Sequence, residues 1–176
     1  MALLPIRLYG DPVLRRKAEP IRKITPEIRE LVADMIETMY DAPGMGLAGP
    51  QVGVPLRLFV IDPTFGEGEE GEAFALINPV LKSHGERVVC EEGCLSLPDI
   101  RADVVRPAKA SVDYLTVDGE AVHLEADELL ARLIQHECDH LEGILFVDRI
   151  SPVRRQLLSK QLKAMARSRK KARAVA

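Results

Sequence analysis

Hydrophobic residues recur with helical spacing in three segments of the chain. The apolar positions in residues 25–42 and in residues 127–142 fall on one face of a helix, and Gly143 is a typical C-terminal stop for the second segment. A third segment starts after Ser151 and Pro152, which together form a common helix N-terminus. The pattern therefore predicts three amphipathic helices. We expect the last helix to pack on the body through Val153, Leu157, Leu158, Leu162 and Met165.

Short apolar runs of strand length lie between the first two predicted helices. These runs cover residues 56–61, 74–77, 86–90, 100–105, 110–117 and 121–124. The last two runs flank Asp118-Gly119, a pair typical of hairpin turns. Residues 43–51 are too rich in glycine and proline for a regular element, and residues 66–72 read as an exposed loop. The expected fold is α+β, with antiparallel β-sheets around the central helix 127–142, a further amphipathic helix and a C-terminal helix.

Composition places the chain among soluble globular proteins. Its 176 residues are 47% hydrophobic and 29% charged, which suits one domain with one core. No apolar run approaches the roughly 20 residues of a membrane span, and charged residues interrupt the N-terminus before a signal peptide could form. Three cysteines are an odd number without an export signal, which argues against a disulfide framework. We therefore expect a cytoplasmic protein.

Charge divides the chain into two parts. All 27 acidic residues and 14 of the 24 basic residues lie in 1–148, so that part has a net charge of −13. Residues 149–176 carry the other 10 basic residues and no acid. Such a basic arm favours binding to nucleic acid, ribonucleoprotein or an acidic surface, although a solvated helix face is an equally good interpretation. We expect residues 1–150 to form a single catalytic domain and residues 151–176 a basic C-terminal helix and tail.

The second predicted helix contains the run His136-Glu137-Cys138-Asp139-His140. Histidines four residues apart lie one turn above the other, so both imidazoles can reach one metal ion. Glu137 follows the first histidine, where its carboxylate can act on a water molecule without binding the metal. Cys138 lies on another side of the helix and is expected to pack in the core. A satisfied pair of helix histidines is the alternative interpretation.

A catalytic metal site typically needs a third protein ligand. No further histidine follows His140, so the third ligand must lie upstream, among His84, His123 and the cysteines. Cys94 is favoured because Gly93 beside it allows backbone and thiol to approach an ion closely. Cys90, at the end of a predicted strand, is expected to pack against other side chains.

Three segments together resemble the signature motifs of one enzyme family. The segments are GMGLAGPQ (44–51), EGCLS (92–96) and QHECDH (135–140), and they resemble those of peptide deformylases in the same order and at similar separations. Residues 6–15 are similar to that family's N-terminus, and the basic C-terminal helix is similar to that of its bacterial type-1 subgroup. Gly49 stands where the family usually has alanine, which we expect to loosen the loop and shift Gln51 slightly.

The resemblance implies a metal-dependent hydrolase that removes the N-formyl group from the formyl-methionine of nascent polypeptides and releases formate. It implies one divalent ion held by Cys94, His136 and His140, with Fe(II) favoured and Zn, Ni or Co also found in its place. Glu137 would serve as general base and then as general acid. The side-chain amide of Gln51 and the backbone N–H of Leu95 would stabilise the oxyanion together with the metal.

Substrate contacts are predicted from the same resemblance and from helical spacing. Gly46 is the expected main-chain partner of an extended formyl-methionyl peptide. We expect the methionine pocket to be bordered by Met45, Leu129, Arg132 and Leu133, with the charge of Arg132 hydrated at the rim. Ordinary core or surface positions are the alternative for each of the four. Glu92 is expected to support the site in a pair with Arg106.

Two other functions fit parts of the sequence. A general metallopeptidase could use the same helix motif, and it would need a groove for peptide on both sides of the cleaved bond. A structural metal module on the ribosome could use the basic tail, but it would have no use for Glu137. For the deformylase interpretation, the expected partners are N-formyl-methionyl peptides and the ribosome, the latter through the basic C-terminal helix. No membrane and no sequence-specific nucleic acid are expected.

Overall fold

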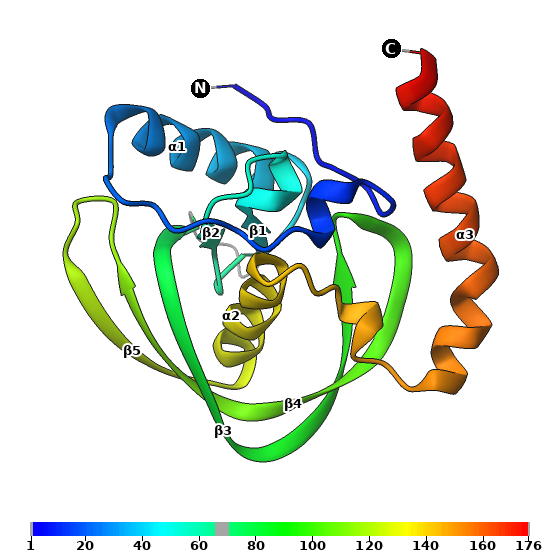
Figure 1. Ribbon diagram of the computed structural model, residues 1–176. Helices are drawn as coiled ribbons and strands as arrows, with labels where there is room; N and C mark the ends of the chain where they lie inside the picture. The colour runs from blue at the N-terminus through cyan, green and yellow to red at the C-terminus, as the bar shows by residue number, and fades with distance from the viewer. Residues whose placement is uncertain (1, 66–70, 176) are drawn as a thin grey trace.

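The computed structural model describes residues 2–65 and 71–175, with side chains through Ser168. Most of the predicted loop 66–72 therefore lies outside the described residues. Within these described ranges, three α-helices and a five-stranded sheet make up the fold (Figure 1). The helices are α1 (Pro26–Asp41), α2 (Glu128–Leu141) and α3 (Pro152–Val175). The strands are β1 (Gly46–Ala48), β2 (Leu58–Ile61), β3 (Phe74–Cys94), β4 (Leu97–Leu115) and β5 (Ala121–Asp127). Three short 3-10 helices are η1 (Pro12–Arg15), η2 (Gly49–Val52) and η3 (Phe146–Asp148).

The strands follow the order β1-β2-β3-β4-β5, and each pairs antiparallel with the next. The predicted α+β class with three amphipathic helices is confirmed. Helices α1 and α2 begin and end within a residue of the predicted bounds, and Gly143 adopts φ +73° just after α2. The hairpin at Asp118-Gly119 is also confirmed, because Leu115 pairs with Ala121 across that turn.

The prediction of separate short strands between residues 74 and 117 was wrong. Runs 74–77 and 86–90 belong to the single strand β3, and runs 100–105 and 110–117 belong to β4. Irregularities in the pairing register stand where breaks were expected, including one between the pairs His84/Lys109 and Arg87/Pro107. Gly85, at φ +87°, lies in this bulge and not in a turn. The polar residues between the predicted runs of β3 therefore remain in the strand, because they pair with residues of β4.

The expectation of no regular element in residues 43–51 was also wrong. Gly46–Ala48 form β1, whose Leu47 pairs with Val60 of β2, and Gly49–Val52 form η2. Leu47 and Ala48 are fully buried, so tertiary packing stabilises a strand that local propensity opposes.

Helix α2 lies at the centre of the molecule, with β3 and β4 curving around it (Figure 1). Its apolar face packs in one buried cluster with residues of β2, β3, β4 and β5, and this cluster includes Cys138 as predicted. A second cluster lies between α1 and strands β1 and β2, and a third joins the Leu97 end of β4 to η3 and α3. Cys90, expected to pack, is exposed instead.

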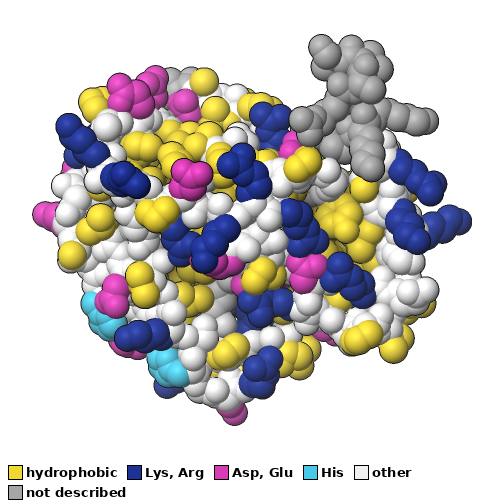
Figure 2. Space-filling view, viewed as in Figure 1, with side chains coloured by type: hydrophobic (Ala, Val, Ile, Leu, Met, Phe, Trp, Pro, Cys, Tyr) yellow, Lys and Arg dark blue, Asp and Glu magenta, His cyan; other side chains and the backbone are white. Residues whose placement is uncertain are grey.

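Helix α3 runs along one side of the body (Figure 1). Leu162 is buried, and Leu158 and Met165 pack partly buried against the third cluster, as predicted. Val153 and Leu157 were predicted to dock but are 72% and 70% exposed. Figure 2 shows Lys and Arg side chains along the side on which α3 lies. In the described part of the chain, no helix has the length and apolar character needed to cross a membrane.

Candidate metal centre

Three metal-ligating side chains meet where α2 passes the end of β3. His136 and His140 lie one turn apart on α2, and their rings are 5.1 Å apart with an edge-on angle of 71°. Cys94, the last residue of β3, places its Sγ 3.3 Å from Nε2 of His140. One ligand atom from each of the three residues lies within 4.8 Å of the other two. The structure thus brings together the three residues predicted as ligands.

The donor set fits a divalent ion with thiolate and imidazole ligands. Nδ1 of His136 lies 3.0 Å from Oε2 of Glu92, which leaves Nε2 as its ligand atom. Burial first, and then the neighbouring His136, Arg106 and Arg15, hold the pKa of His140 well below its ordinary value, so this imidazole is in the neutral form that binds metals. In His136 burial lowers the pKa, but contacts with Cys94 and Glu92 outweigh it, so a proton competes with a metal for this ring.

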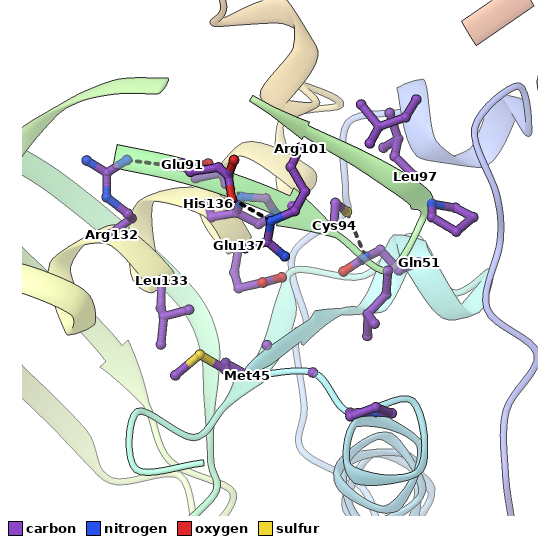
Figure 3. A pocket seen from close by; sticks show the side chains of 18 of the residues that line it. Met45, Gln51, Glu91, Cys94, Leu97, Arg101, Arg132, Leu133, His136 and Glu137 are labelled. Carbon is purple, nitrogen blue, oxygen red and sulfur yellow. Dashed lines mark hydrogen bonds and ion pairs between the residues drawn. The ribbon is translucent and has the colours of Figure 1, made fainter. Parts of the chain in front are cut away.

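Gln51 is held beside the thiol by hydrogen bonds at both ends of its amide. Its Oε1 accepts from the backbone N–H of Ala48 at 2.8 Å. Its Nε2 donates to Oγ of Ser96 at 3.1 Å and lies 3.4 Å from Sγ of Cys94 (Figure 3). The amide N–H₂ therefore faces the thiol of Cys94. Leu95, the other predicted oxyanion donor, follows Cys94 directly and lines the same cavity.

Gly49, the departure from the family pattern, does not loosen this segment as expected. A Cβ at this position would lie 2.7 Å from the carbonyl oxygen of Val54 and 2.9 Å from that of Leu56. The missing methyl group therefore lets two stretches of backbone approach closely. Gln51, two residues on, is only 1% exposed.

Glu137 is a buried carboxyl group next to the candidate ligands. It is 3% exposed, and its Oε2 has no hydrogen-bond partner among the described residues. Burial raises the pKa of Glu137 to about 7, against the opposing charges of His136 and Arg106. A Cβ at Gly46 would lie 2.4 Å from its Oε1, so only glycine leaves room for the carboxylate. A carboxyl with this pKa can both accept and return a proton near neutral pH.

A network of buried charges surrounds His136. Arg106 donates to both oxygens of Glu92, at 2.7 and 2.9 Å, which confirms the predicted pair. Arg106 also donates to Asp139 at 2.8 Å, and Asp139 pairs in turn with Arg149. Burial alone would raise the pKa of Glu92, but hydrogen bonds from His136 and Arg106 hold it far below its ordinary value. Sequence reasoning missed Asp139 and Arg149, although an acid inside a metal-binding helix was a signal for a buried partner.

Arg132 does not have the hydrated charge that was predicted. Its side chain is 13% exposed, and its guanidinium donates to Glu92 and to two backbone carbonyls of β3 and β4. The carboxylate of Glu92 and the strand carbonyls therefore replace water around this charge.

A cavity of about 490 Å³ opens beside Cys94 and His136, two of the three candidate ligands (Figure 3). All five predicted substrate-contact residues line it, namely Met45, Gly46, Leu129, Arg132 and Leu133. Gln51, Cys94, Leu95, His136 and Glu137 line it as well. Sequence reasoning missed the rest of the lining, which includes Pro43, Glu91, Leu97, Ile100 and Arg101. The buried carboxyl group of Glu137 therefore lines a space large enough for a small peptide.

Comparison with known proteins agrees with this geometry. Residues 3–156 match the family model described as polypeptide deformylase. A peptide deformylase of Rhizobium meliloti is 48% identical over 170 residues, which cover 96% of this chain and 97% of that protein. One from Acidobacterium capsulatum is 48% identical over 168 residues, covering 96% of this chain and 98% of its own.

Solved structures show the same likeness. The crystal structure of peptide deformylase from Thermotoga maritima has a TM-score of 0.80 and 44% identity, covering 86% of this chain and all of its own. The peptide deformylase from Synechococcus elongatus, solved in complex with actinonin, has a TM-score of 0.85 and 43% identity, covering 90% of this chain and 87% of its own.

Proposed function

Because this chain belongs to the polypeptide deformylase family, we propose that Cys94, His136 and His140 hold its divalent metal ion and that Glu137 moves the proton in its reaction. The enzyme hydrolyses the N-formyl group from the formyl-methionine terminus of nascent polypeptides and releases formate. The observation that carries the assignment of roles is the buried Glu137 carboxyl group, whose Oε2 has no hydrogen-bond partner among the described residues, beside a Cys-His-His group.

The family is metal-dependent, and the thiolate with two imidazoles is the donor set for its ion. When bound, a divalent ion polarises the formyl carbonyl and lowers the pKa of water from 15.7 to about 7. We favour Fe(II) as the native ion on the resemblance of the signature motifs to the family. Zn, Ni or Co can take its place, because all four metals bind nitrogen and sulfur ligands.

Glu137 provides the proton transfers. Its carboxylate accepts a proton from the attacking water and returns that proton to the departing amine. The pKa of about 7 suits both steps, since neither the acid nor the base form is strongly favoured at neutral pH. Gly46 permits this position of the carboxylate, because its lack of a side chain leaves space for Oε1.

Gln51 and Leu95 stabilise the negative charge that forms on the formyl oxygen. The bond from Ala48 to Oε1 of Gln51 fixes which end of the amide faces the ligands, so its N–H₂ group is ready to donate. The backbone N–H of Leu95 is the second donor in this proposal. Loss of one such donor typically lowers turnover by about 10²–10³-fold.

The substrate peptide lies in extended form beside β1. Within the described sheet, β1 pairs with β2 alone, so the backbone of Gly46 can pair with a peptide on its other edge. The methionine side chain fills the space bordered by Met45, Leu129, Arg132 and Leu133.

We further propose that residues 1–150 are the catalytic domain and that the basic helix and tail 151–176 dock the enzyme on the ribosome in the cytoplasm. The net charge of +10 in residues 149–176 and the exposed Val153 and Leu157 support an external partner for this helix. Cosedimentation with ribosomes that weakens with salt and with deletion of residues 167–176 is the expected result.

The variant Glu137→Gln tests the assignment of the proton carrier. This nearly isosteric change should lower formate release from formyl-Met-Ala-Ser by about 10²–10⁴-fold, the usual contribution of acid–base catalysis. Metal content and thermal stability should remain close to wild type. Glu142→Gln, an acid just after the same helix, is the matched control and should keep its activity. Full deformylation by Glu137→Gln would contradict the proposal, and cleavage of internal peptide bonds would favour a general metallopeptidase.

A further inference from the structure

Arg132 is a cation in the middle of the apolar face that α2 turns toward the cavity. Leu129, Arg132, Leu133 and His136 follow helical spacing and all line the cavity. The aliphatic stem of Arg132 therefore forms part of the pocket wall between two leucines. Figure 3 shows its head directed away from Leu133 and Met45.

The guanidinium of Arg132 binds three acceptors on the sheet. It donates to Oε1 of Glu92 at 2.6 Å, to the carbonyl of Val104 at 3.3 Å and to the carbonyl of Val88 at 3.0 Å. Because the head makes three hydrogen bonds and the stem lies in the wall, a change in the rotamer of the stem would have to move or break these hydrogen bonds.

Glu92 connects this head to a metal-ligand candidate. One carboxylate oxygen accepts from Arg132, and the other lies 3.0 Å from Nδ1 of His136. Partners of this kind set the orientation of a ligating imidazole.

Neutralising Glu92 does not require Arg132. Arg106 already donates to both oxygens of Glu92 and is itself only 3% exposed. Arg106 does not line the cavity, whereas Arg132 does. The distinctive property of Arg132 is therefore that it joins the pocket wall to the carboxylate that holds His136.

We propose that Arg132 is a positioning residue that couples filling of the side-chain pocket to the orientation of His136 through Glu92. This inference rests on the proposed function. A methionine side chain packed against the stem restricts the rotamers of Arg132, and the ordered guanidinium then restricts Glu92. Part of the binding energy of the methionine side chain thereby appears in kcat and not only in KM.

The kinetic test compares formyl-Met-Ala-Ser with formyl-Ala-Ala-Ser, whose short side chain leaves the pocket unfilled. In the wild type, methionine should raise kcat as well as lower KM. Arg132→Met keeps an apolar wall but has no head to bind Glu92. This variant should lose about 10-fold in kcat on the methionine substrate and much less on the alanine substrate. A loss of this size is expected for a residue that helps to orient a metal ligand. Arg132→Lys keeps one charge without the fork and should recover part of the loss.

A second readout does not depend on turnover. In cobalt-substituted protein, visible absorption reports the geometry of the ligands. Addition of Met-Ala-Ser should change this spectrum more than Ala-Ala-Ser in the wild type, and both peptides should act alike in Arg132→Met.

An equal loss of kcat on both substrates, or a change in KM alone, would overturn the coupling. If Arg132→Met does not fold, Arg132→Lys decides the question through the same two ratios. Wild-type protein that releases no formate would instead count against the proposed function, so the two failures are distinguishable.

Discussion

Helices α2 and α3 are both amphipathic, but the protein holds them in different ways. Helix α2 is enclosed by the sheet and carries eight buried residues, among them the charged or polar Gln135, Glu137, Asp139 and His140. Helix α3 is longer, at 24 residues against 14, yet among its described side chains only Leu162 is buried. One helix is fixed from several sides, and the other is attached along a narrow line.

This difference places the candidate site on the enclosed helix α2 and leaves most of the described side chains of α3 exposed to solvent. Buried charges around α2 have fixed partners, so the candidate ligand His136 is oriented before any substrate binds. Helix α3 leaves Val153 and Leu157 exposed in a strongly basic segment. Changes near α2 should therefore alter catalysis and stability strongly, while changes on the outer face of α3 should alter neither.

The largest effect is expected at the thiol that closes the α2 site. Cys94→Ala should lower metal content and abolish formate release. The loss of activity should exceed the roughly 100-fold loss that follows removal of a residue that only hydrogen-bonds to a metal ligand. Cys90→Ala is the matched control, since Cys90 is exposed and lies four residues away on the same strand. Formate release and metal analysis of both variants provide the measurement. Equal losses in the two variants would mean that Cys94 has no special role.

The next effect is expected in the buried charges. Arg106→Met leaves Glu92 and Asp139 short of a partner and should lower the free energy of unfolding by about 3–5 kcal/mol. Arg101→Met, on the same strand as Arg106, removes an ion pair with Glu91 of β3, but both side chains of that pair are more than half exposed. Its cost should stay below about 1 kcal/mol. Denaturant unfolding of both variants measures the difference, and similar costs would show that the network around α2 is not a stability determinant.

Local patterns in the sequence were enough for α1, α2 and the hairpin at Asp118-Gly119, because spacing and turn chemistry act between near neighbours. The same reasoning placed His136 and His140 one turn apart. Cys94 was favoured by its glycine neighbour and by the family motif, and the structure brings its thiol to the two rings.

Non-local pairing explains most of the errors. Strand β1 and the continuous strands β3 and β4 depend on partners distant in sequence, which short-range patterns do not reveal. Likewise, the buried position of the Arg132 charge depends on Glu92, 40 residues away, and the exposure of Leu157 depends on where α3 leaves the body. Amphipathic spacing predicted that α3 packs through its apolar face, but it did not predict which helical turns contact the rest of the protein.

A pair of leucines within α3 sharpens the comparison on one helix. Leu162→Ala should lower the free energy of unfolding by about 2–3 kcal/mol, because it opens a cavity in the cluster that includes Leu14 and Phe146. Leu157→Ala should change it by less than about 0.5 kcal/mol, as expected for an exposed site. Neither variant should change kcat. A large cost for Leu157→Ala in thermal or denaturant unfolding would show that the outer face of α3 is not free.

The smallest effect concerns the acid that joins α3 to the body. Asp148 accepts from Arg155 of α3 at 2.8 Å, from the backbone N–H of Leu145 at 2.9 Å and from Arg15. Partial burial raises the pKa of Asp148, but hydrogen bonds from Arg15, Leu145 and Arg155 outweigh it and hold the pKa below its ordinary value.

A lowered folded-state pKa means that the stabilisation from Asp148 is complete above the unfolded value of about 3.9 and is lost as the pH falls through the folded value. Wild type should therefore exceed Asp148→Asn in Tm near pH 7, by an amount equivalent to about 1 kcal/mol or less for each partly exposed pair, and this difference should shrink as the pH falls below about 3.9. Asp118→Asn, which removes an exposed pair with Arg29, should show a smaller gap at every pH. A difference between wild type and Asp148→Asn that does not vary with pH would mean that packing, and not the charge of Asp148, holds α3 against the body.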